Sequence, residues 1–364
     1  MRIGLPMRQA DNLRRTKGTT AVQMKDVAAR AGVSISTVSH VVNNTRPVAG
    51  DTRDRVLEIM RELSYYKNVS GRRLARGRSD AFGLIISDIE NPFFPELIKN
   101  FDQAAVEVGF DVFLSTTNYD SKHAENAVRR MIENKVQGVA VMTSQIDSIR
   151  IDELLANDIP VVLLDGGGVS RGRSNVRVDY SRGAREVVEY LRNMGHEQIS
   201  FITGPQNRTS ARTYKQALMT ALENNRMHLT RCVEGNHTIE GGRAAMLSLL
   251  AEKDVPSAVL CGNDLTALGA IRALAESGIP VPSQFSIIGA DDISYARYAN
   301  PPLTTVRVAR DQVGKMAFLA LQRLARTRRR TGAEYVVETH LVIRDSSCAA
   351  SSPVNLHSAL QPSP

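Results

Sequence analysis

Residues 24–44 read MKDVAARAGVSISTVSHVVNN, and this stretch has the period of two short helices joined by a tight turn. Small and branched apolar residues recur at helical spacing in its first half, and Gly32 follows where a helix is expected to end. Ser34 is placed to cap the second helix. The expected inward-facing residues are Val27, Ala28 and Ala31 in the first helix and Val38, Val41 and Val42 in the second. The pattern is typical of a helix-turn-helix, whose second helix enters the major groove of DNA.

A third helical pattern and a strong local charge accompany this pair. Val56, Met60 and Leu63 recur at helical spacing between about Gly50 and Ser64. Residues 1–80 hold 16 Lys and Arg against 7 Asp and Glu, whereas residues 81–364 hold 30 against 31. The net charge of +8 therefore comes from the first part of the chain. A basic head on a neutral body indicates a nucleic-acid-binding module joined to another unit.

The outer face of the second helix provides the candidate DNA contacts. Ile35 suits a thymine methyl, Ser36 suits several base edges, and His40 suits a purine N7 or a guanine O6. The smaller polar candidates, several of them suited to phosphates, are Ser34, Thr37, Ser39 and Asn43. A plain amphipathic helical hairpin explains the same period, and the charge asymmetry favours DNA binding over it.

From Ala81 onward, short β-rich runs alternate with amphipathic helical stretches. The expected strands are 82–86, 112–114, 138–142, 160–165, 199–203, 258–261 and 285–288, and two clear helices are 182–194 and 265–276. Such alternation predicts βαβ units, and hence an α/β body with parallel sheets covered by helices on both faces. About 270 residues of this pattern is long for a single sheet, so we expect two similar lobes.

Polar residues follow several of the expected strands. In parallel α/β lobes, ligands bind at the carboxyl ends of strands and, with two lobes, in the cleft between them. The candidates for ligand binding at these ends are Asp88, Asn91, Asp165, Asn263, Asp264 and Asp291. Each of them also suits a helix N-cap or a turn, and their recurrence at equivalent strand ends favours a ligand site.

The opening stretch, together with Thr52-Arg-Asp-Arg-Val56 and Leu74-Ala-Arg-Gly77, closely resembles the head of the lactose/galactose repressor (LacI/GalR) family. The likeness continues in the family's order through residues 82–94, 262–270, 287–291 and 301–306, so it spans roughly residues 24–344. It implies an all-α helix-turn-helix head, a hinge helix, and a body of two doubly wound parallel-sheet lobes like those of periplasmic binding proteins.

The resemblance also implies how such a chain acts on DNA. It implies a homodimer, with a tetramer left open, that binds a pseudo-palindromic operator and responds to a small polar effector such as a sugar, a sugar acid or a purine. In the family, the segment between head and body folds into a hinge helix on DNA, and a leucine enters the minor groove. Leu74 occupies that position here, and the arginines expected on phosphates around it are Arg72, Arg73 and Arg76.

By the same resemblance, several side chains of the body fall in the family's effector cleft. Phe93 and Phe94 look like a stacking platform, and Asp291 looks like an acceptor for ligand donors. Arg208 aligns with a ligand contact, and His237 falls near the cleft. These positions add to the polar candidates at the strand ends.

One departure from the family falls among these positions. Tyr214 stands where the family typically has an arginine that grips the effector, and Arg212 lies two residues earlier. Three interpretations follow: Arg212 substitutes from a shifted turn, the protein binds a different ligand, or it binds none.

These patterns predict the following division of the chain. A disordered basic arm (1–20) precedes the helix-turn-helix domain (21–67) and the hinge helix (68–78). The effector-binding and dimerisation body covers 79–345, with lobe 1 at about 79–178 and 308–331, and lobe 2 at about 179–307 and 332–345. A disordered, low-complexity tail is expected over 346–364.

Composition excludes several other classes of protein. Cys232, Cys261 and Cys348 are too few and too scattered for a disulfide framework or a spaced metal site. No apolar run reaches the roughly 18 residues of a membrane helix, and residues 1–18 lack the apolar region of a secretory signal. We therefore expect a cytoplasmic, nucleoid-associated protein without a cofactor, a metal or a membrane partner.

Two other functions fit the sequence less well than regulation. An enzyme is disfavoured because the chain lacks a phosphate-binding loop and a nucleophile elbow, and Arg171 interrupts the glycine cluster 166–172 where a dinucleotide site needs glycine. A cytosolic solute-binding protein without direct DNA binding is the main alternative, since the body alone resembles periplasmic sugar-binding proteins. The helix-turn-helix pattern argues against that alternative.

Overall fold

The computed structural model describes residues 22–65, 79–143, 146–252, 256–327 and 329–350. The chain divides into two compact units, residues 1–76 and 77–364. The expected basic arm, the expected hinge helix with Leu74 and its three arginines, and residues 351–364 of the expected tail lie outside the described ranges.

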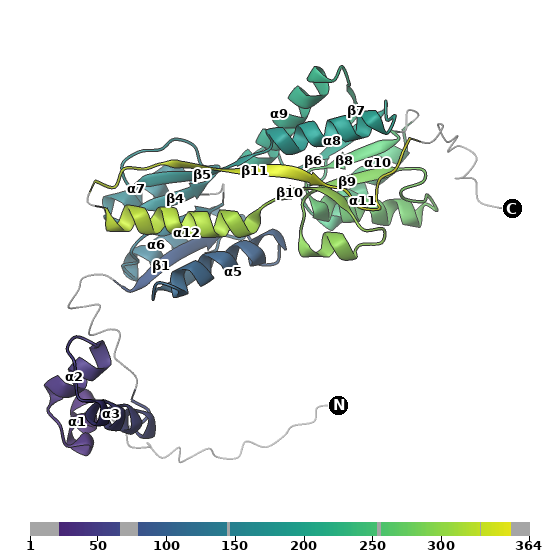
Figure 1. The fold of residues 1–364 in the computed structure, drawn as a ribbon. Helices are drawn as coiled ribbons and strands as arrows, with labels where there is room; N and C mark the ends of the chain where they lie inside the picture. The colour runs from purple at the N-terminus through teal and green to yellow at the C-terminus, as the bar shows by residue number, and fades with distance from the viewer. Residues whose placement is uncertain (1–21, 66–78, 144–145, 253–255, 328, 351–364) are drawn as a thin grey trace, which may run out of the picture. The chain divides into compact units, whose positions relative to one another are not determined.

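The first unit is a three-helix head (Figure 1). Its helices are α1 (Met24–Ala31), α2 (Ile35–Asn43) and α3 (Gly50–Glu62). Gly32 ends α1 with a φ of 65°, a backbone conformation that glycine adopts without steric cost. The buried core of the head is Val27, Ala28, Ala31, Val38, Val41, Val56, Ile59 and Tyr65. The expected helix-turn-helix is therefore present. In α3, Val56 is fully buried as expected, whereas Ile59 is buried in place of Met60, which is half-buried.

The second unit begins with a lobe built on five parallel strands in the order β2-β1-β3-β4-β5. The strands of lobe 1 are β1 (Ala81–Ile86), β2 (Asp111–Thr116), β3 (Val139–Met142), β4 (Val161–Leu164) and β5 (Arg173–Asp179). Its helices are α5 (Phe93–Val106), α6 (Ser121–Glu133) and α7 (Ser148–Ala156), joined later in the chain by α12 (Arg310–Arg326). The apolar runs that predicted these strands are almost completely buried in β1, β3 and β4.

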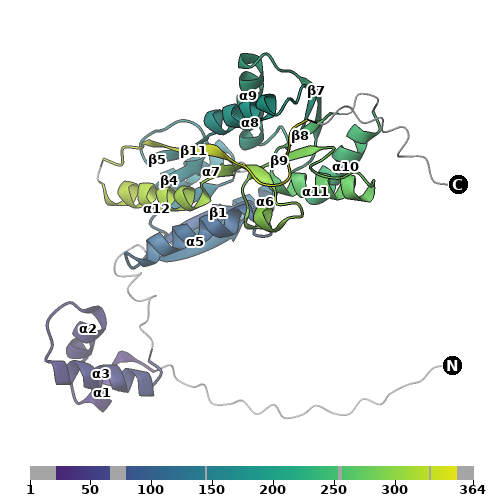
Figure 2. The same ribbon diagram turned by 45° about the vertical axis from the view of Figure 1, so that its right-hand side comes forward.

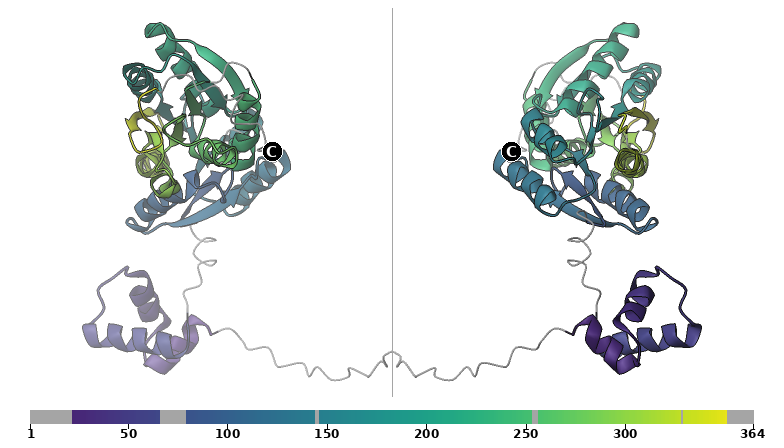
Figure 3. Two further views of the ribbon diagram at one scale, coloured as in Figure 1. Left: turned by 90° about the vertical axis from the view of Figure 1, so that its right-hand side faces the viewer. Right: turned by 90° about the vertical axis from the view of Figure 1, so that its left-hand side faces the viewer.

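Lobe 2 continues the sheet with the order β10-β9-β8-β6-β7. Its strands are β6 (Ile199–Thr203), β7 (Leu229–Glu234), β8 (Ala258–Cys261), β9 (Ser286–Asp291) and β10 (Thr304–Val308). Its helices are α8 (Ser181–Asn193), α9 (Thr209–Asn224), α10 (Ile239–Leu250), α11 (Asp264–Glu276) and the 3-10 helix η1 (Ser294–Tyr298). Figure 3 shows helices on both faces of the strands, as the alternating pattern predicts.

Strand β11 (Glu334–Val342) belongs to both lobes. Residues 334–338 pair in parallel with β5, and residues 339–342 pair antiparallel with β10. Assigning 332–345 to lobe 2 alone is therefore wrong, because the first half of the strand completes the sheet of lobe 1.

Helix α12 lies against α5, side by side in Figures 1 and 2. Gly314 permits this close approach, since a Cβ there would lie 2.3 Å from the carbonyl oxygen of Leu97. Phe318 of α12 also packs edge-on against Phe82 of β1 and Phe101 of α5. The sequence predicts α12 in lobe 1, and these contacts place it there.

The expectation of a disordered tail is wrong for residues 346–350, because they pack on lobe 2. The Ser346 hydroxyl donates to the carbonyl of Ile287 at 2.6 Å, and the Ile287 N–H donates to the carbonyl of Ser346 at 2.8 Å. The Ala350 N–H donates to the carbonyl of Met194 at 2.8 Å. A serine-rich segment looks like a solvated tail in sequence, but here its polar groups complete hydrogen bonds of the adjoining elements.

Candidate functional site

The outer side of α2 is the face that the sequence predicts to contact DNA. The Ser34 hydroxyl accepts from the Thr37 N–H at 3.0 Å, so it caps the helix as expected. Ile35 and Ser36 are exposed beside it, with 54% of Ile35 accessible. An isoleucine exposed at the first turn of a recognition helix is placed to meet an apolar surface such as a thymine methyl.

Later residues of α2 have local partners. The His40 Nδ1 lies 2.8 Å from the hydroxyl of Thr45, which orients the ring and leaves Nε2 for another partner. The Asn43 amide donates to the Ser39 hydroxyl at 3.1 Å. Of the predicted DNA contacts in the head, Ser34, Ile35 and Ser36 are exposed, while Thr37, Ser39, His40 and Asn43 are half-buried.

The body contains a cavity of about 110 Å³ at the carboxyl ends of the strands of both lobes. The side chains that line it from lobe 1 follow β1 to β5: Ser87, Asn91, Phe93, Phe94, Tyr119, Thr143, Asp165 and Tyr180. Those that line it from lobe 2 follow or end β6 to β9: Arg208, Ser210, Tyr214, His237, Asn263 and Asp291. This is the cleft in which a two-lobed α/β protein is expected to bind a ligand.

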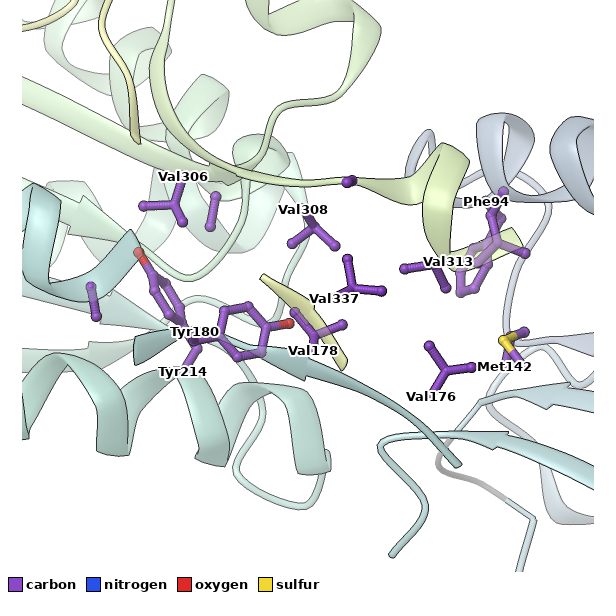
Figure 4. Packing of buried hydrophobic residues seen from close by; sticks show 14 of the residues in the cluster. Phe94, Met142, Val176, Val178, Tyr180, Tyr214, Val306, Val308, Val313 and Val337 are labelled. Carbon is purple, nitrogen blue, oxygen red and sulfur yellow. The ribbon is translucent and has the colours of Figure 1, made fainter. Parts of the chain in front are cut away.

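Aromatic rings form much of the cavity wall. Phe93 and Phe94 meet edge to face with ring centres 5.3 Å apart, and Tyr180 and Tyr214 lie 5.2 Å apart. In Figure 4 the two tyrosines lie next to each other beside Val178. Flat apolar surfaces of this kind suit ligands with a ring.

Asp165 brings a carboxylate into the cavity from lobe 1. It follows β4 with a φ of 50°, and its side chain accepts from the Val178 N–H at 2.8 Å. Burial raises the pKa of the Asp165 carboxyl to about 6, against the opposing effects of the Val178 hydrogen bond and of Arg177. This carboxylate changes its protonation close to neutral pH.

Asp291 brings a second carboxylate from lobe 2, at the end of β9. Burial raises its pKa to about 7, opposed by the charge of Arg310. Its φ of 104° is unusual for a residue with a side chain. Arg310 donates to the backbone carbonyl of Asp291, and to that of Asp292 at 2.7 Å, and thereby stabilises this turn.

Arg208 and His237 lie on the lobe 2 side of the cavity. The Arg208 guanidinium stacks over the ring of Tyr119 at 4.0 Å from its centre, so this contact connects the lobes. Burial and the neighbouring Arg208 lower the pKa of His237 to about 4, and the imidazole is therefore neutral. Its Nε2 is buried and has no hydrogen-bond partner among the described residues.

Tyr214 is 3% exposed, and its hydroxyl likewise has no hydrogen-bond partner among the described residues. Burial raises its pKa above the ordinary value, so the hydroxyl keeps its proton and can donate. Arg212 does not line the cavity: it donates to the carbonyl of Gln206 at 2.8 Å and to the Thr209 hydroxyl at 3.3 Å. This arrangement favours the other two interpretations over a substitution by Arg212.

Two other predicted ligand residues also lie outside the cavity lining. Asp88 accepts from the Glu90 N–H at 2.8 Å, as a turn residue does. Asp264 is fully buried and accepts from the Ile293 N–H at 2.7 Å and from the Thr305 hydroxyl. Both residues thus have a structural role, which is the alternative to ligand binding for residues at strand ends.

Asn91 and Asn263 combine the two roles. The side-chain Oδ1 of Asn91 accepts from the Phe93 N–H at 3.0 Å, and the side-chain Oδ1 of Asn263 caps α11 by accepting from the Thr266 N–H at 2.9 Å. Both line the cavity as well.

Sequence reasoning missed six polar or aromatic residues of the wall: Ser87, Tyr119, Thr143, Tyr180, Thr209 and Ser210. Ser87 and Thr143 directly follow β1 and β3, so the rule applied to the other strand ends could have found them. Tyr119 lies three residues after β2, and Tyr180 follows β5, a strand that the sequence analysis did not predict.

The described ranges contain neither a candidate membrane span nor a candidate metal-binding group. None of their helices combines the length and apolarity needed to cross a membrane. Nor do they bring three or more His, Cys, Asp or Glu side chains together as a group that could hold a metal ion.

Comparison with known proteins agrees with the architecture of both units. A family described as bacterial regulatory proteins, lacI family, matches residues 23–68, and a periplasmic binding protein-like domain matches residues 188–347. The lac repressor dimer bound to operator and the anti-inducer ONPF has a TM-score of 0.80 and 28% identity, covering 90% of this chain and 99% of that one. A complex of the transcriptional regulator CelR with cellobiose has a TM-score of 0.68 and 29% identity, covering 89% of this chain and 99% of that one. The head and body thus define a DNA-binding transcriptional regulator.

Curated relatives give the family. The HTH-type transcriptional repressor PurR of Haemophilus influenzae (strain PittEE) is 36% identical over 298 residues, which cover 81% of this chain and 88% of the relative. PurR of Pasteurella multocida (strain Pm70) is 34% identical over 329 residues, which cover 89% of this chain and 98% of the relative. The chain belongs to the LacI family of bacterial regulatory proteins, and these relatives are repressors rather than enzymes.

Proposed function

We propose that the protein is a cytoplasmic repressor that binds a pseudo-palindromic operator as a homodimer. The binding of a small polar metabolite lowers or raises its affinity for the operator. The observation that carries the effector role is the cavity, because strands β1 to β9 of both lobes all deliver side chains to it. The relatives named as repressors, and the lac repressor dimer seen on operator, support the regulatory part.

In the head, we assign base reading to Ile35, Ser36 and His40, and phosphate contacts to Ser34, Thr37 and Ser39, with Asn43 beside them. The exposed first turn of α2 supports this assignment. In the hinge, we assign Leu74 to the minor groove, with Arg72, Arg73 and Arg76 on phosphates.

The effector that fits the cavity is a small ring compound with hydrogen-bond donors and at least one acceptor: a sugar, a sugar acid or a purine. The aromatic walls suit the ring, and Asp165 and Asp291 accept from its donors. Arg208 and the unpartnered hydroxyl of Tyr214 donate to its acceptors. Tyr214 offers a neutral donor where relatives have a cation, so we expect a less acidic effector than an arginine would select.

The mechanism is thermodynamic linkage. An effector changes operator affinity only through its differential affinity for two arrangements of the body. A ligand that touches Asp165 of lobe 1 and Asp291 of lobe 2 at once depends on how the lobes are placed. Binding therefore favours one arrangement of the lobes, which the hinge transmits to the head.

The test begins with thermal-shift screening of the full chain against sugars, sugar acids and purines. Each compound that raises the unfolding temperature is then added to a titration of operator DNA selected from random sequence. We expect the same compound to change operator affinity by about fivefold or more, the lower end of typical coupling. Stabilising compounds that leave operator affinity unchanged would contradict the effector role.

The hinge assignment has a separate test. Gel-shift titration of Leu74→Ala is expected to show weaker operator binding and reduced DNA bending, because the wedge between base pairs is removed. Unchanged affinity together with unchanged bending contradicts the hinge assignment and leaves the cavity proposal untouched.

A further inference from the structure

A second hollow of about 540 Å³ lies in lobe 1, at the C-terminal end of α12. Its polar lining comes from Arg171, Arg326, Arg330, Thr327 and Asp158, which we call the arginine groove. This groove shares no lining residue with the cleft cavity. Arginine is the cation whose planar fork matches two oxygens of a phosphate at once.

The charges of the arginine groove are only partly neutralised. Arg330 pairs with Asp158, whose second carboxylate oxygen lies 3.1 Å from an Arg330 nitrogen. Within the described ranges, no carboxylate forms an ion pair with Arg171, Arg326 or the adjacent exposed Arg329. Residues 81–364 as a whole carry a balance of 30 basic against 31 acidic residues, so the groove concentrates positive charge that the rest of the body lacks.

The groove opens on a defined edge of the lobe 1 sheet. Ile159 and Gly172 line it, and they directly precede β4 and β5, so the groove lies at the amino ends of these strands. Strands β1, β3, β4 and β5 are parallel, so their amino ends share one edge. The chain arriving from the head enters the body at this edge, where β1 begins at Ala81.

We propose that the arginine groove binds backbone phosphates of the DNA that flanks the segment read by the head. The proposal rests on the DNA-binding function assigned above. Phosphate contacts of this kind add affinity without sequence preference, because each neutralised phosphate releases condensed counterions. A body that is otherwise net acidic then contributes to operator affinity through this one edge.

The test compares two duplexes and two double variants of the full chain. The operator is first selected from random DNA with the wild-type protein, then prepared either trimmed to the two half-sites or extended by about one helical turn on each side. The groove variant carries Arg171→Ala and Arg326→Ala, neither of which breaks an ion pair among the described residues. The control carries Arg185→Ala and Arg192→Ala, two exposed arginines of α8 that lose the same charge.

On the extended duplex, we expect the groove variant to bind at least about threefold more weakly. Its salt slope should be shallower by about 3.6, which is 0.9 for each of four phosphates, two per protomer of the proposed dimer. On the trimmed duplex it should match the wild type, and the control should match the wild type on both. Equal affinity and equal salt slope of groove variant and wild type on the extended duplex would overturn the proposal. A wild-type protein that selects no DNA would instead contradict the DNA-binding function itself.

Discussion

The guanidinium of Arg310 donates to the carboxylate of Glu96 at 3.0 Å, and the same guanidinium reaches the backbone carbonyls of Asp291 and Asp292. Glu96 lies in the first turn of α5, directly after Phe93 and Phe94 of the cavity wall. Arg310 is 2% exposed and begins α12, where the chain passes from lobe 2 into lobe 1. One buried side chain therefore connects both walls of the cavity.

Replacement of this side chain tests the connection. Arg310→Lys keeps the charge but replaces the planar guanidinium, which has several N–H donors, with a single ammonium group. The lysine therefore cannot hold Glu96 and both carbonyls together. We expect a fall of about 1–3 kcal/mol in the free energy of unfolding by urea, and weaker effector binding because the turn at Asp291 loses support. Arg323→Lys, at an exposed position later in α12, is the control and should leave both quantities unchanged. Equal effector affinity of Arg310→Lys and wild type would show that the turn does not need Arg310.

The raised pKa of Asp291 predicts how stability depends on pH. A carboxyl with a folded pKa of about 7 binds its proton more tightly in the native state than in the unfolded chain. Its contribution to stability is thus present below the unfolded pKa of about 4 and is lost as the pH rises through 7. We expect Asp291→Asn to gain stability relative to the wild type between pH 5 and pH 8, measured by urea unfolding at each pH.

Asp179 provides the control for this pH dependence. Hydrogen bonds from Ser181 lower its pKa, so it is ionised in both states throughout the range from pH 5 to pH 8. The difference in stability between Asp179→Asn and wild type should therefore stay constant over this range. A constant difference for Asp291→Asn as well would contradict the assigned raised pKa.

Tyr214→Phe separates stability from ligand binding. The hydroxyl is buried without a partner among the described residues, so its removal should raise the stability of the empty protein by about 1 kcal/mol. Effector affinity should fall by up to about tenfold, because a donor to the ligand is lost. Tyr190→Phe is the matched control: its hydroxyl lies 3.0 Å from that of Ser347, so its removal should lower stability. Unfolding curves with and without the effector measure both effects, and an unchanged affinity for Tyr214→Phe excludes the hydroxyl as a ligand contact.

Binding-site selection on random DNA tests which residues contact bases and which contact phosphates. His40→Ala should relax preference at one or two base pairs in each half-site, since the imidazole is assigned to a base edge. Arg73→Ala should weaken binding to all sequences alike, since the guanidinium is assigned to phosphate. Identical selected profiles for wild type and His40→Ala would refute the base-reading role.

The parts of the fold that the sequence predicts are those where local chemistry and tertiary structure agree. Ser34 caps α2 and Gly32 ends α1, so single residues define where these two helices of the head meet. The buried runs of β1, β3 and β8 are continuous and apolar, as central parallel strands require. Strand β5 was missed because Arg173 and Arg177 interrupt its apolar residues, and both side chains find partners outside the core.

The sequence predicts where the cavity lies better than it predicts which residues line it. Every strand end that the sequence identifies does reach the cavity region, yet Asn263 lines the cavity while its neighbour Asp264 is buried beneath it. Adjacent residues after a strand point in different directions, and the turn that decides between them depends on contacts with distant residues such as Thr305. In the same way, Tyr214 lines the cavity and Arg212 does not, because tertiary packing decides which side of α9 faces the cavity.

Strand β11 has a mechanical consequence for any change in the body. Because its two halves are hydrogen-bonded to strands of different lobes, the lobes cannot slide past each other without breaking strand pairs. The pairs with β5 end at Glu338 and the pairs with β10 begin at Thr339, so we expect any rotation of the lobes to twist the strand between these two residues. A metabolite that contacts both lobes would then favour one degree of twist in the strand. We expect the strand to return to its ligand-free twist when the metabolite leaves.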